Sequence, residues 1–196
     1  MEAHPSLILL LLLLSCFAAS SYAHNVRFSN LNHSLIVTVS TTPGQVLRAG
    51  EDQVTITWLY NTSYTGSDAN YTTVEAWLCY APVSQTGRDD RKTDDSLDND
   101  KTCPFEITDG PYRRSNNSFV WTVPRDIPTA TYFVRVYALR SKDHETAYGQ
   151  STDALKTTSL FQVNGTVSNQ EVSAAVIGGS FGYGYAWLLM LFLAYI

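Results

Sequence analysis

The chain has 196 residues, a formal net charge of −5 and a hydrophobic fraction of 44%. This length allows one domain of ordinary size once the apolar ends are set aside, and it leaves little room for a second. A mildly acidic chain lacks the basic face that a nucleic-acid partner requires, which excludes nucleic-acid binding.

The N-terminal end has the pattern of a secretory signal peptide. Residues 7–14 form an apolar run, and small residues follow at Ser21 and Ala23, as a signal peptidase requires. The run is too short to span a bilayer comfortably. We therefore predict that residues 1–23 are a signal peptide and that residues 24–165 form an extracellular domain.

Inside this domain, short runs rich in Val, Ile, Thr, Tyr and Trp are separated by turn-forming residues, which predicts β-strands. No sustained helical period occurs there. The expected strands are residues 35–39, 54–58, 74–81, 117–123, 131–139 and 160–163. The strand at 131–139 is the most regular, with Tyr132, Val134, Val136 and Ala138 on one face and Phe133, Arg135 and Tyr137 on the other. Strands at this spacing predict an all-β sandwich of two sheets.

Two details narrow the class of sandwich. Trp58 ends an early strand on its buried face. The stretch from Ile127 and Pro128 to Tyr132 resembles the corner of fibronectin type III domains, where a Tyr hydroxyl bonds back to upstream backbone. The inter-sheet cysteine pair of antibody domains is absent at these positions. We expect an immunoglobulin-like sandwich nearer the fibronectin type III variant.

The cysteines allow one disulfide in the domain. Cys16 leaves with the signal peptide, so Cys79 and Cys103 remain as the only possible intrachain pair, in a compartment that oxidises thiols. Closing this loop of about 25 residues would stabilise the fold by about 3.5 kcal/mol. The alternative is a pair of buried free thiols.

Residues 88–101 form the one dense charged segment. The acids do not follow the order of an EF-hand calcium loop. One interpretation is a solvated surface loop. The other is a docking surface that the disulfide holds in shape, because ordering a floppy loop on binding costs affinity. Arg91 and Asp100 have opposite charge, so they could pair within the loop or bind a partner.

No catalytic apparatus is evident, and we predict that the protein is not an enzyme. The histidines lack a Cys or a second His at metal-ligand spacing, and no phosphate loop or nucleophile elbow occurs. We predict no metal, no cofactor and no small-molecule substrate.

Sequons for N-glycosylation occur at Asn32, Asn61, Asn70, Asn116 and Asn164.

The C-terminal end predicts a membrane segment. Residues 166–173 form a linker, and residues 174–196 hold no charged residue, which is long enough for a transmembrane helix. No Lys or Arg follows the apolar stretch, so the evidence for a cytoplasmic tail is missing. Three explanations stay open: a helix that ends flush with the far surface, a truncated or mis-spliced product, or a signal exchanged for a lipid anchor.

Several unusual strings resemble those of the plant high-affinity nitrate transporter-activating proteins. They are CYAPVSQ at 79–85, RKT at 91–93, DKTC at 100–103, RDIPTATYFVR at 125–135, AYGQSTD at 147–153 and KTT at 156–158. The resemblance covers about residues 30–165 in order. Family members usually end with a membrane helix and a short basic tail, and this chain lacks the tail.

The resemblance implies an accessory subunit that does not itself carry nitrate. Such a subunit binds a high-affinity nitrate/nitrite porter of the major facilitator class, which depends on it for reaching the plasma membrane and for activity. Arg91 and Asp100 are the implied partner-binding residues. The expected location is the plasma membrane, with a single span and the N-terminal domain outside. The alternative functions are an adhesion or receptor-type ectodomain, lipid-anchored or single-pass, and a secreted enzyme.

Overall fold

The computed structural model describes residues 26–115, 117–141 and 144–165. The predicted signal peptide (1–23), linker (166–173) and membrane helix (174–196) lie outside these residues, as does Asn116. Within the described ranges, no helix has the length and apolar character needed to cross a membrane.

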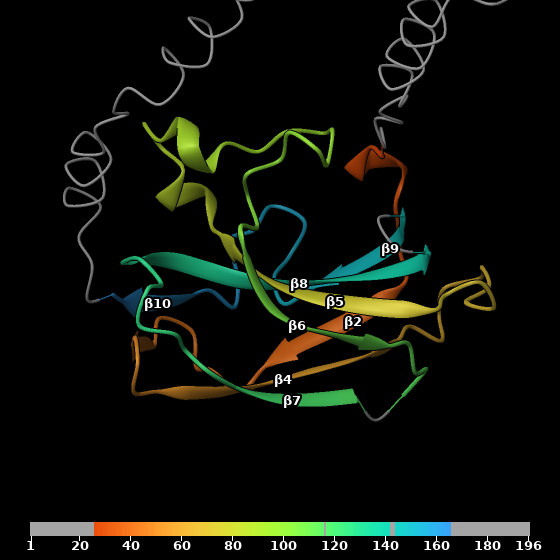
Figure 1. Ribbon diagram of the computed structural model, residues 1–196, viewed down its shortest axis with the longest axis horizontal. Helices are drawn as coiled ribbons and strands as arrows, with labels where there is room; N and C mark the ends of the chain where they lie inside the picture. Colours follow the sequence, from red (N-terminus) through yellow and green to blue (C-terminus); the bar gives the residue numbers. More distant parts are fainter. Residues whose placement is uncertain (1–25, 116, 142–143, 166–196) are drawn as a thin grey trace, which may run out of the picture.

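Two β-sheets stack face to face (Figure 1). The small sheet has three strands in the order β2 (Leu35–Val39), β4 (Gln53–Tyr60) and β7 (Asn117–Thr122). The large sheet has seven strands: β1 (Asn32–His33), β3 (Val46–Arg48), β5 (Thr73–Tyr80), β6 (Phe105–Pro111), β8 (Ala130–Ser141), β9 (His144–Gln150) and β10 (Phe161–Asn164). The all-β, immunoglobulin-like prediction is thus confirmed for the described domain.

Alternation along the strands builds the core between the sheets. In β4, alternate side chains from Val54 to Tyr60 are buried, and Trp58 lies on this buried face as predicted. Burying each large apolar side chain stabilises the fold by about 1.5–3 kcal/mol, which makes this face the main source of stability. Neighbouring strands of the same sheet add the buried side chains of Leu35, Val37 and Trp121. The facing sheet adds Leu78, Tyr132, Val134, Val136 and Phe161.

The corner before β8 has the expected geometry. The Tyr132 hydroxyl donates a hydrogen bond to the backbone oxygen of Pro128 at 2.7 Å. Tyr132 is fully buried, and this burial raises the pKa of its hydroxyl far above the ordinary value. The hydroxyl therefore stays protonated and fixes the turn that leads into β8, which confirms the fibronectin-like feature.

Each of the six expected strands is present, and four further strands were not predicted. β1 and β3 are too short to show a periodicity, and β9 is largely polar. β6 contains Asp109, Gly110 and Pro111, which are typical of a turn. Pairing with β5 overrides this local preference, and the register between the two strands shifts at Ala76 and Trp77.

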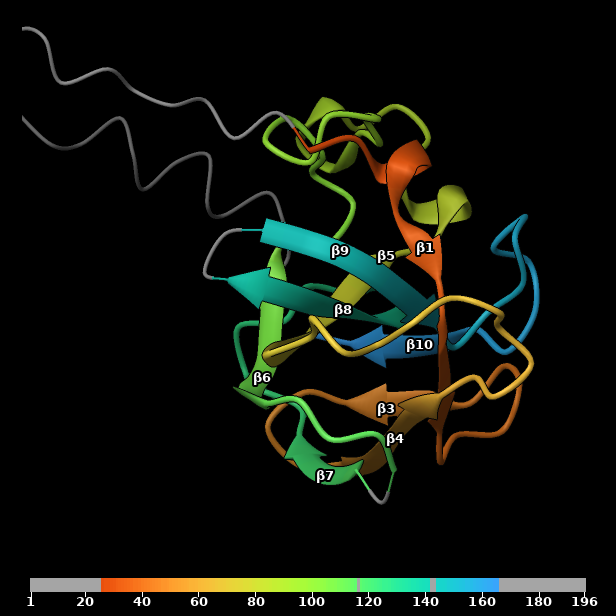
Figure 2. The same cartoon turned by 90° about the vertical axis from the view of Figure 1, so that its right-hand side faces the viewer.

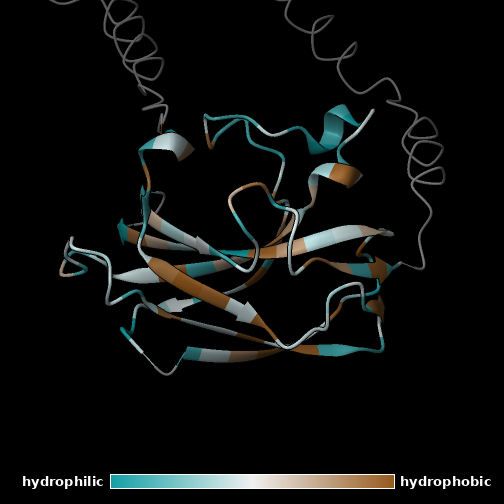
Figure 3. Cartoon of the chain, turned by 180° about the vertical axis from the view of Figure 1, so that it is seen from behind, coloured by the Kyte–Doolittle hydropathy of each residue, from teal (hydrophilic) through white to brown (hydrophobic). Residues whose placement is uncertain are grey.

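Both faces of β8 are buried. The outward face, with Phe133, Arg135 and Tyr137, is covered as fully as the inward one. The cover is a layer of loop above the large sheet, which contains the short 3₁₀ helices η1 (Phe28–Asn30), η2 (Pro82–Ser84) and η3 (Asp89–Arg91). This layer is mostly hydrophilic in Figure 3, whereas hydrophobic residues follow the strands.

Candidate functional site: the disulfide-closed loop

The disulfide joins one strand to the approach of its neighbour. Cys79 lies near the end of β5, Cys103 lies just before β6, and the two sulfur atoms are bonded as the sequence suggested. The bond therefore stays within the large sheet and does not connect the two sheets. We call residues 79–103 the disulfide loop. It lies over the outward face of β8 (Figure 1).

Asp100 ties the disulfide loop together. One carboxylate oxygen, Oδ1, accepts hydrogen bonds from the backbone N–H of Asp94 at 3.2 Å and of Thr102 at 3.1 Å. The other, Oδ2, lies 3.6 Å from Nη1 of Arg135, and the two side chains are only 6% and 2% exposed. This single carboxylate joins two parts of the disulfide loop to the strand beneath it.

Arg135 is the largest fully buried side chain in the described domain. Its Nη1 donates to the hydroxyl of Tyr137 at 3.0 Å, and its guanidinium carbon lies 4.2 Å from the ring centre of Phe28. A buried charge is tolerated only when it is paired, so Asp100 is the partner that this cation requires. The positive charge of Arg135 also affects Lys156. Burial is the main cause that lowers the pKa of the Lys156 ammonium, and repulsion by Arg135 lowers it further.

Arg91 is also buried, at 4% exposure. Its guanidinium carbon lies 4.1 Å from the ring centre of Tyr80, and Nη1 donates to the backbone oxygen of Ser84 at 3.1 Å. The Nε atom of Arg91 lies 3.8 Å from the Oδ2 atom of Asp90, with which it forms an ion pair. Arg91 and Asp100 therefore do not pair with each other, because each pairs with a different group.

The N-terminal segment closes over the disulfide loop. The carboxylate of Asp95 accepts from the backbone N–H and the hydroxyl of Ser29 at 2.8 and 3.0 Å. Backbone hydrogen bonds join Phe28 N to Asp95 O at 2.7 Å and Leu97 N to Val26 O at 2.9 Å. The start of the domain, the disulfide loop and β8 therefore form one packed unit.

The structure places the two predicted partner-binding residues inside this unit. The side chains of Arg91 and Asp100 are buried and hold the shape of the disulfide loop. They would therefore affect partner binding indirectly, by positioning the exposed residues around them. Their part in partner binding stays a prediction. The exposed charged residues of the disulfide loop are Asp89, Asp90, Lys92, Asp95, Asp98 and Lys101. Arg135 was not predicted as a site residue, because sequence alternation does not show that a loop covers its face.

The predicted glycosylation sites lie near strand ends. Asn32 begins β1, Asn61 directly follows β4, Asn70 lies in the connection to β5, and Asn164 ends β10. Asn32, Asn70 and Asn164 are exposed, whereas Asn61 is half-buried. Their occupancy by glycans stays a prediction.

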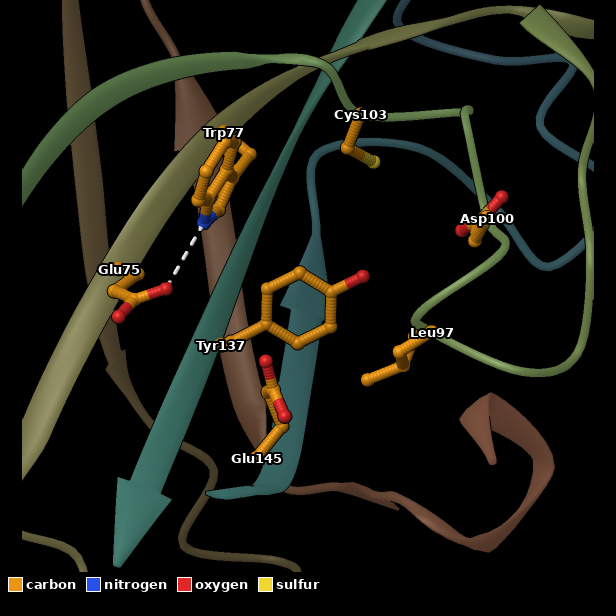
Figure 4. Close-up of a pocket in the computed structure, with 7 residues that line it drawn as sticks. All are labelled: Glu75, Trp77, Leu97, Asp100, Cys103, Tyr137 and Glu145. Carbon is orange, nitrogen blue, oxygen red and sulfur yellow. Dashed lines mark hydrogen bonds between the residues drawn. The ribbon is translucent and has the colours of Figure 1, made fainter. Parts of the chain in front are cut away.

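A cavity of about 220 Å³ opens beside the disulfide loop (Figure 4). It is lined by Glu75, Trp77, Leu97, Asp100, Cys103, Tyr137 and Glu145. The carboxylate of Glu75 accepts a hydrogen bond from the indole N–H of Trp77 at 3.3 Å. Burial raises the pKa of Glu75, and the carboxylates of Glu145, Glu106 and Asp109 raise it further. No three His, Cys, Asp or Glu side chains of the described residues could hold a metal ion.

Replacing Glu75 with Gln should stabilise the protein at neutral pH. Because the native state binds the Glu75 proton more tightly than the unfolded state, native stability falls as pH rises from about 4.3 through the raised pKa. Glu75→Gln removes this loss and keeps an acceptor for Trp77. We expect the melting temperature of the variant to exceed the native value at pH 7, and the gain to vanish toward pH 4.

Thermal unfolding of both proteins across this pH range checks the prediction. Glu51→Gln is the matched control, since Glu51 is exposed and pairs with Arg48. It should give no such gain. A melting difference between Glu75→Gln and the native chain that does not change with pH would show that burial of this carboxylate is not the cause.

Comparison with known proteins assigns the domain. A family described as "High-affinity nitrate transporter accessory, Ig-like domain" matches residues 28–168. High-affinity nitrate transporter 3.2 of Arabidopsis thaliana is 44% identical over 168 residues, which cover 84% of this chain and 80% of that protein. The probable high-affinity nitrate transporter-activating protein 2.2 of Oryza sativa subsp. japonica is 40% identical over 178 residues, which cover 88% and 84%.

The family match spans every strand of the domain, from β1 to β10. It also includes all the strings on which the resemblance rested. The chain belongs to the family of high-affinity nitrate transporter accessory proteins with an immunoglobulin-like domain.

Proposed function

We propose that this chain is a non-catalytic accessory subunit that binds a high-affinity nitrate porter of the major facilitator class. It enables the porter to reach the plasma membrane and to take up nitrate. The family match over residues 28–168 is the observation that carries the proposal. The relative from Oryza sativa is itself named as a nitrate transporter-activating protein.

The packing of the domain supports a binding role for the disulfide loop. Three strings of the family resemblance, at 79–85, 100–103 and 125–135, meet here. The backbone N–H of Thr131 donates to the hydroxyl of Ser84 at 2.8 Å, and Ala81 N donates to Thr131 O at 2.9 Å. A loop fixed in this way loses little conformational entropy when it binds a partner.

The same proposal places the chain in the plasma membrane with its immunoglobulin-like domain outside the cell. The signal peptide pattern at residues 1–23 and the uncharged stretch at 174–196 support a single span. The disulfide supports an oxidising compartment, since such bonds are rare in the cytosol.

Nitrate uptake tests the function directly. A cell that expresses a high-affinity porter from the same organism is assayed at low external nitrate, with and without the full chain. We expect uptake, and porter at the cell surface, only when the chain is present. Equal uptake in both cells, with the chain present at the surface, would sink the proposal and favour the adhesion or receptor-type ectodomain. Release by a phospholipase would then identify a lipid anchor.

A further inference from the structure

One side of the sandwich has two free strand edges. β7 pairs only with β4 and β6 pairs only with β5, and Figure 2 shows β6 and β7 along the same side. No backbone hydrogen bond extends from the free edge of β7 to any part of the chain that the structure describes. An unpaired edge is a ready template for another strand.

The register shows which backbone groups of β7 are free. Ser40 N donates to Thr55 O at 2.9 Å, so the backbone of Thr55 bonds toward β2. Val120 lies opposite Thr55 in β7. In an antiparallel ladder the bonded residues alternate, so the N–H and C=O groups of Val120, and of Ser118 and Thr122, point away from β4.

The two edges differ in how they are protected. β6 carries Glu106 and Asp109, a register shift, and Pro111 at its end, which are devices that discourage edge pairing. β7 reads Asn-Ser-Phe-Val-Trp-Thr, without charge, proline or bulge, and Val120 is 58% exposed. The free edge of β7 is therefore open to pairing.

A groove of about 200 Å³ lies beside this edge and contains an unpaired donor. It is lined by Trp58, Val74, Thr108, Asp109, Gly110, Pro111, Arg113, Asn117, Ser118 and Phe119. Trp58 is only 7% exposed, and its buried indole N–H has no hydrogen-bond acceptor. Leaving a buried donor unpaired costs about 1–3 kcal/mol, which an incoming acceptor would recover.

We propose that the free edge of β7 binds an extended, uncharged segment of the nitrate porter, which adds a fourth strand to the small sheet. This inference rests on the proposed function. The segment is uncharged because β7 offers no opposite charge, and burying an unpaired charge is costly. An inward-facing side-chain oxygen of this strand displaces a side chain at the rim of the groove and accepts from Trp58.

A second copy of this chain fits the edge less well. If two β7 strands paired, each would turn Asn117, Phe119 and Trp121 toward the cores. The amide nitrogen of Asn117 already donates to Trp58 O at 3.1 Å and to Arg113 O at 2.8 Å. Asn117 is the one inward-facing side chain of a second β7 that carries an oxygen, and its amide nitrogen already holds it to its own domain. A strand of the porter can place an oxygen opposite the indole N–H of Trp58 without this constraint.

Val120→Pro and Val120→Thr form the test pair. Proline removes an N–H that points away from β4 and breaks no hydrogen bond within the ladder, so an edge strand tolerates it. Threonine keeps the N–H and the β-branched side chain. The full chain is co-expressed with the porter, extracted in mild detergent and purified by a tag, and the recovered porter is measured. We expect Val120→Pro to recover at least tenfold less porter than the native chain, and Val120→Thr to match it.

The outcomes separate the possible failures. Recovery of porter by Val120→Pro at the native level overturns the edge proposal and leaves the accessory function standing. If the native chain itself recovers no porter, the proposed function fails first. Recovery of a second, differently tagged copy that is lost in Val120→Pro would show that a second copy occupies the edge. Should Val120→Pro fail to accumulate, Val120→Lys replaces it, since a lysine on the edge also blocks pairing.

Discussion

Replacing Cys79 and Cys103 together with alanine is expected to lower the free energy of unfolding by about 3.5 kcal/mol, the largest loss for any change considered in this domain. The disulfide closes a loop whose sequence separation is 24 residues. Without it the unfolded chain gains conformational freedom. The same loss loosens the cover of β8, so we also expect nitrate uptake to fall when the variant replaces the native subunit.

Denaturant unfolding of the purified chain measures the first effect, and the uptake assay measures the second. The native chain with and without reductant is the internal control, because reductant should destabilise the native protein and leave the variant unchanged. Equal unfolding free energies for variant and native chain would show that the disulfide is not what holds the disulfide loop on the sheet.

Asp100→Asn should lower the free energy of unfolding by about 3 kcal/mol, because it leaves the buried guanidinium of Arg135 without its charge partner. Asparagine keeps an oxygen that can still accept from the backbone of Asp94 and Thr102. The change also creates an Asn-Lys-Thr sequon, so the variant is produced in cells that do not N-glycosylate, and the loss then isolates the charge. Lower porter recovery should accompany it, since Asp100 positions the exposed residues of the disulfide loop.

Asp98→Asn is the matched control, since Asp98 is exposed in the same loop and the change in charge is the same. Denaturant unfolding compares the stabilities, and hydrogen exchange at the amides of Asp94 and Thr102 reports on the loop itself. Identical curves and exchange rates for the two variants would mean that the Asp100 and Arg135 pair contributes nothing to this packing.

Much of the sandwich could be predicted because alternation is a local signal. The strand around Trp58 alternates cleanly, because only one of its faces is buried. The strand around Tyr132 was predicted as well, although both of its faces are buried. β6 and β9 were missed because their pairing with β5 and β8 is a non-local interaction that overrides turn-forming or polar sequence. The sequence-based prediction is therefore strongest where the core alone determines the pattern.

The candidate site could be located from sequence, although its internal arrangement could not. The cysteine pair and the charged run marked the disulfide loop. The sequence did not show that Arg91 turns to Tyr80, or that Asp100 turns to Arg135, which lies 35 residues further along the chain. A charged side chain in a loop is usually solvated, and only the tertiary fold shows that these two are covered.

The burial of β8 on both faces means that the disulfide loop is not an exchangeable module. Its floor is built from Phe133 and Arg135, and its rim is completed by Phe28 near the start of the domain. If residues 79–103 alone were exchanged between two family members, the transferred side chains would therefore pack against Phe133, Arg135 and Phe28 of the recipient and not against the residues of their own chain. A chimaera that exchanges partner preference should carry these three parts of the chain together.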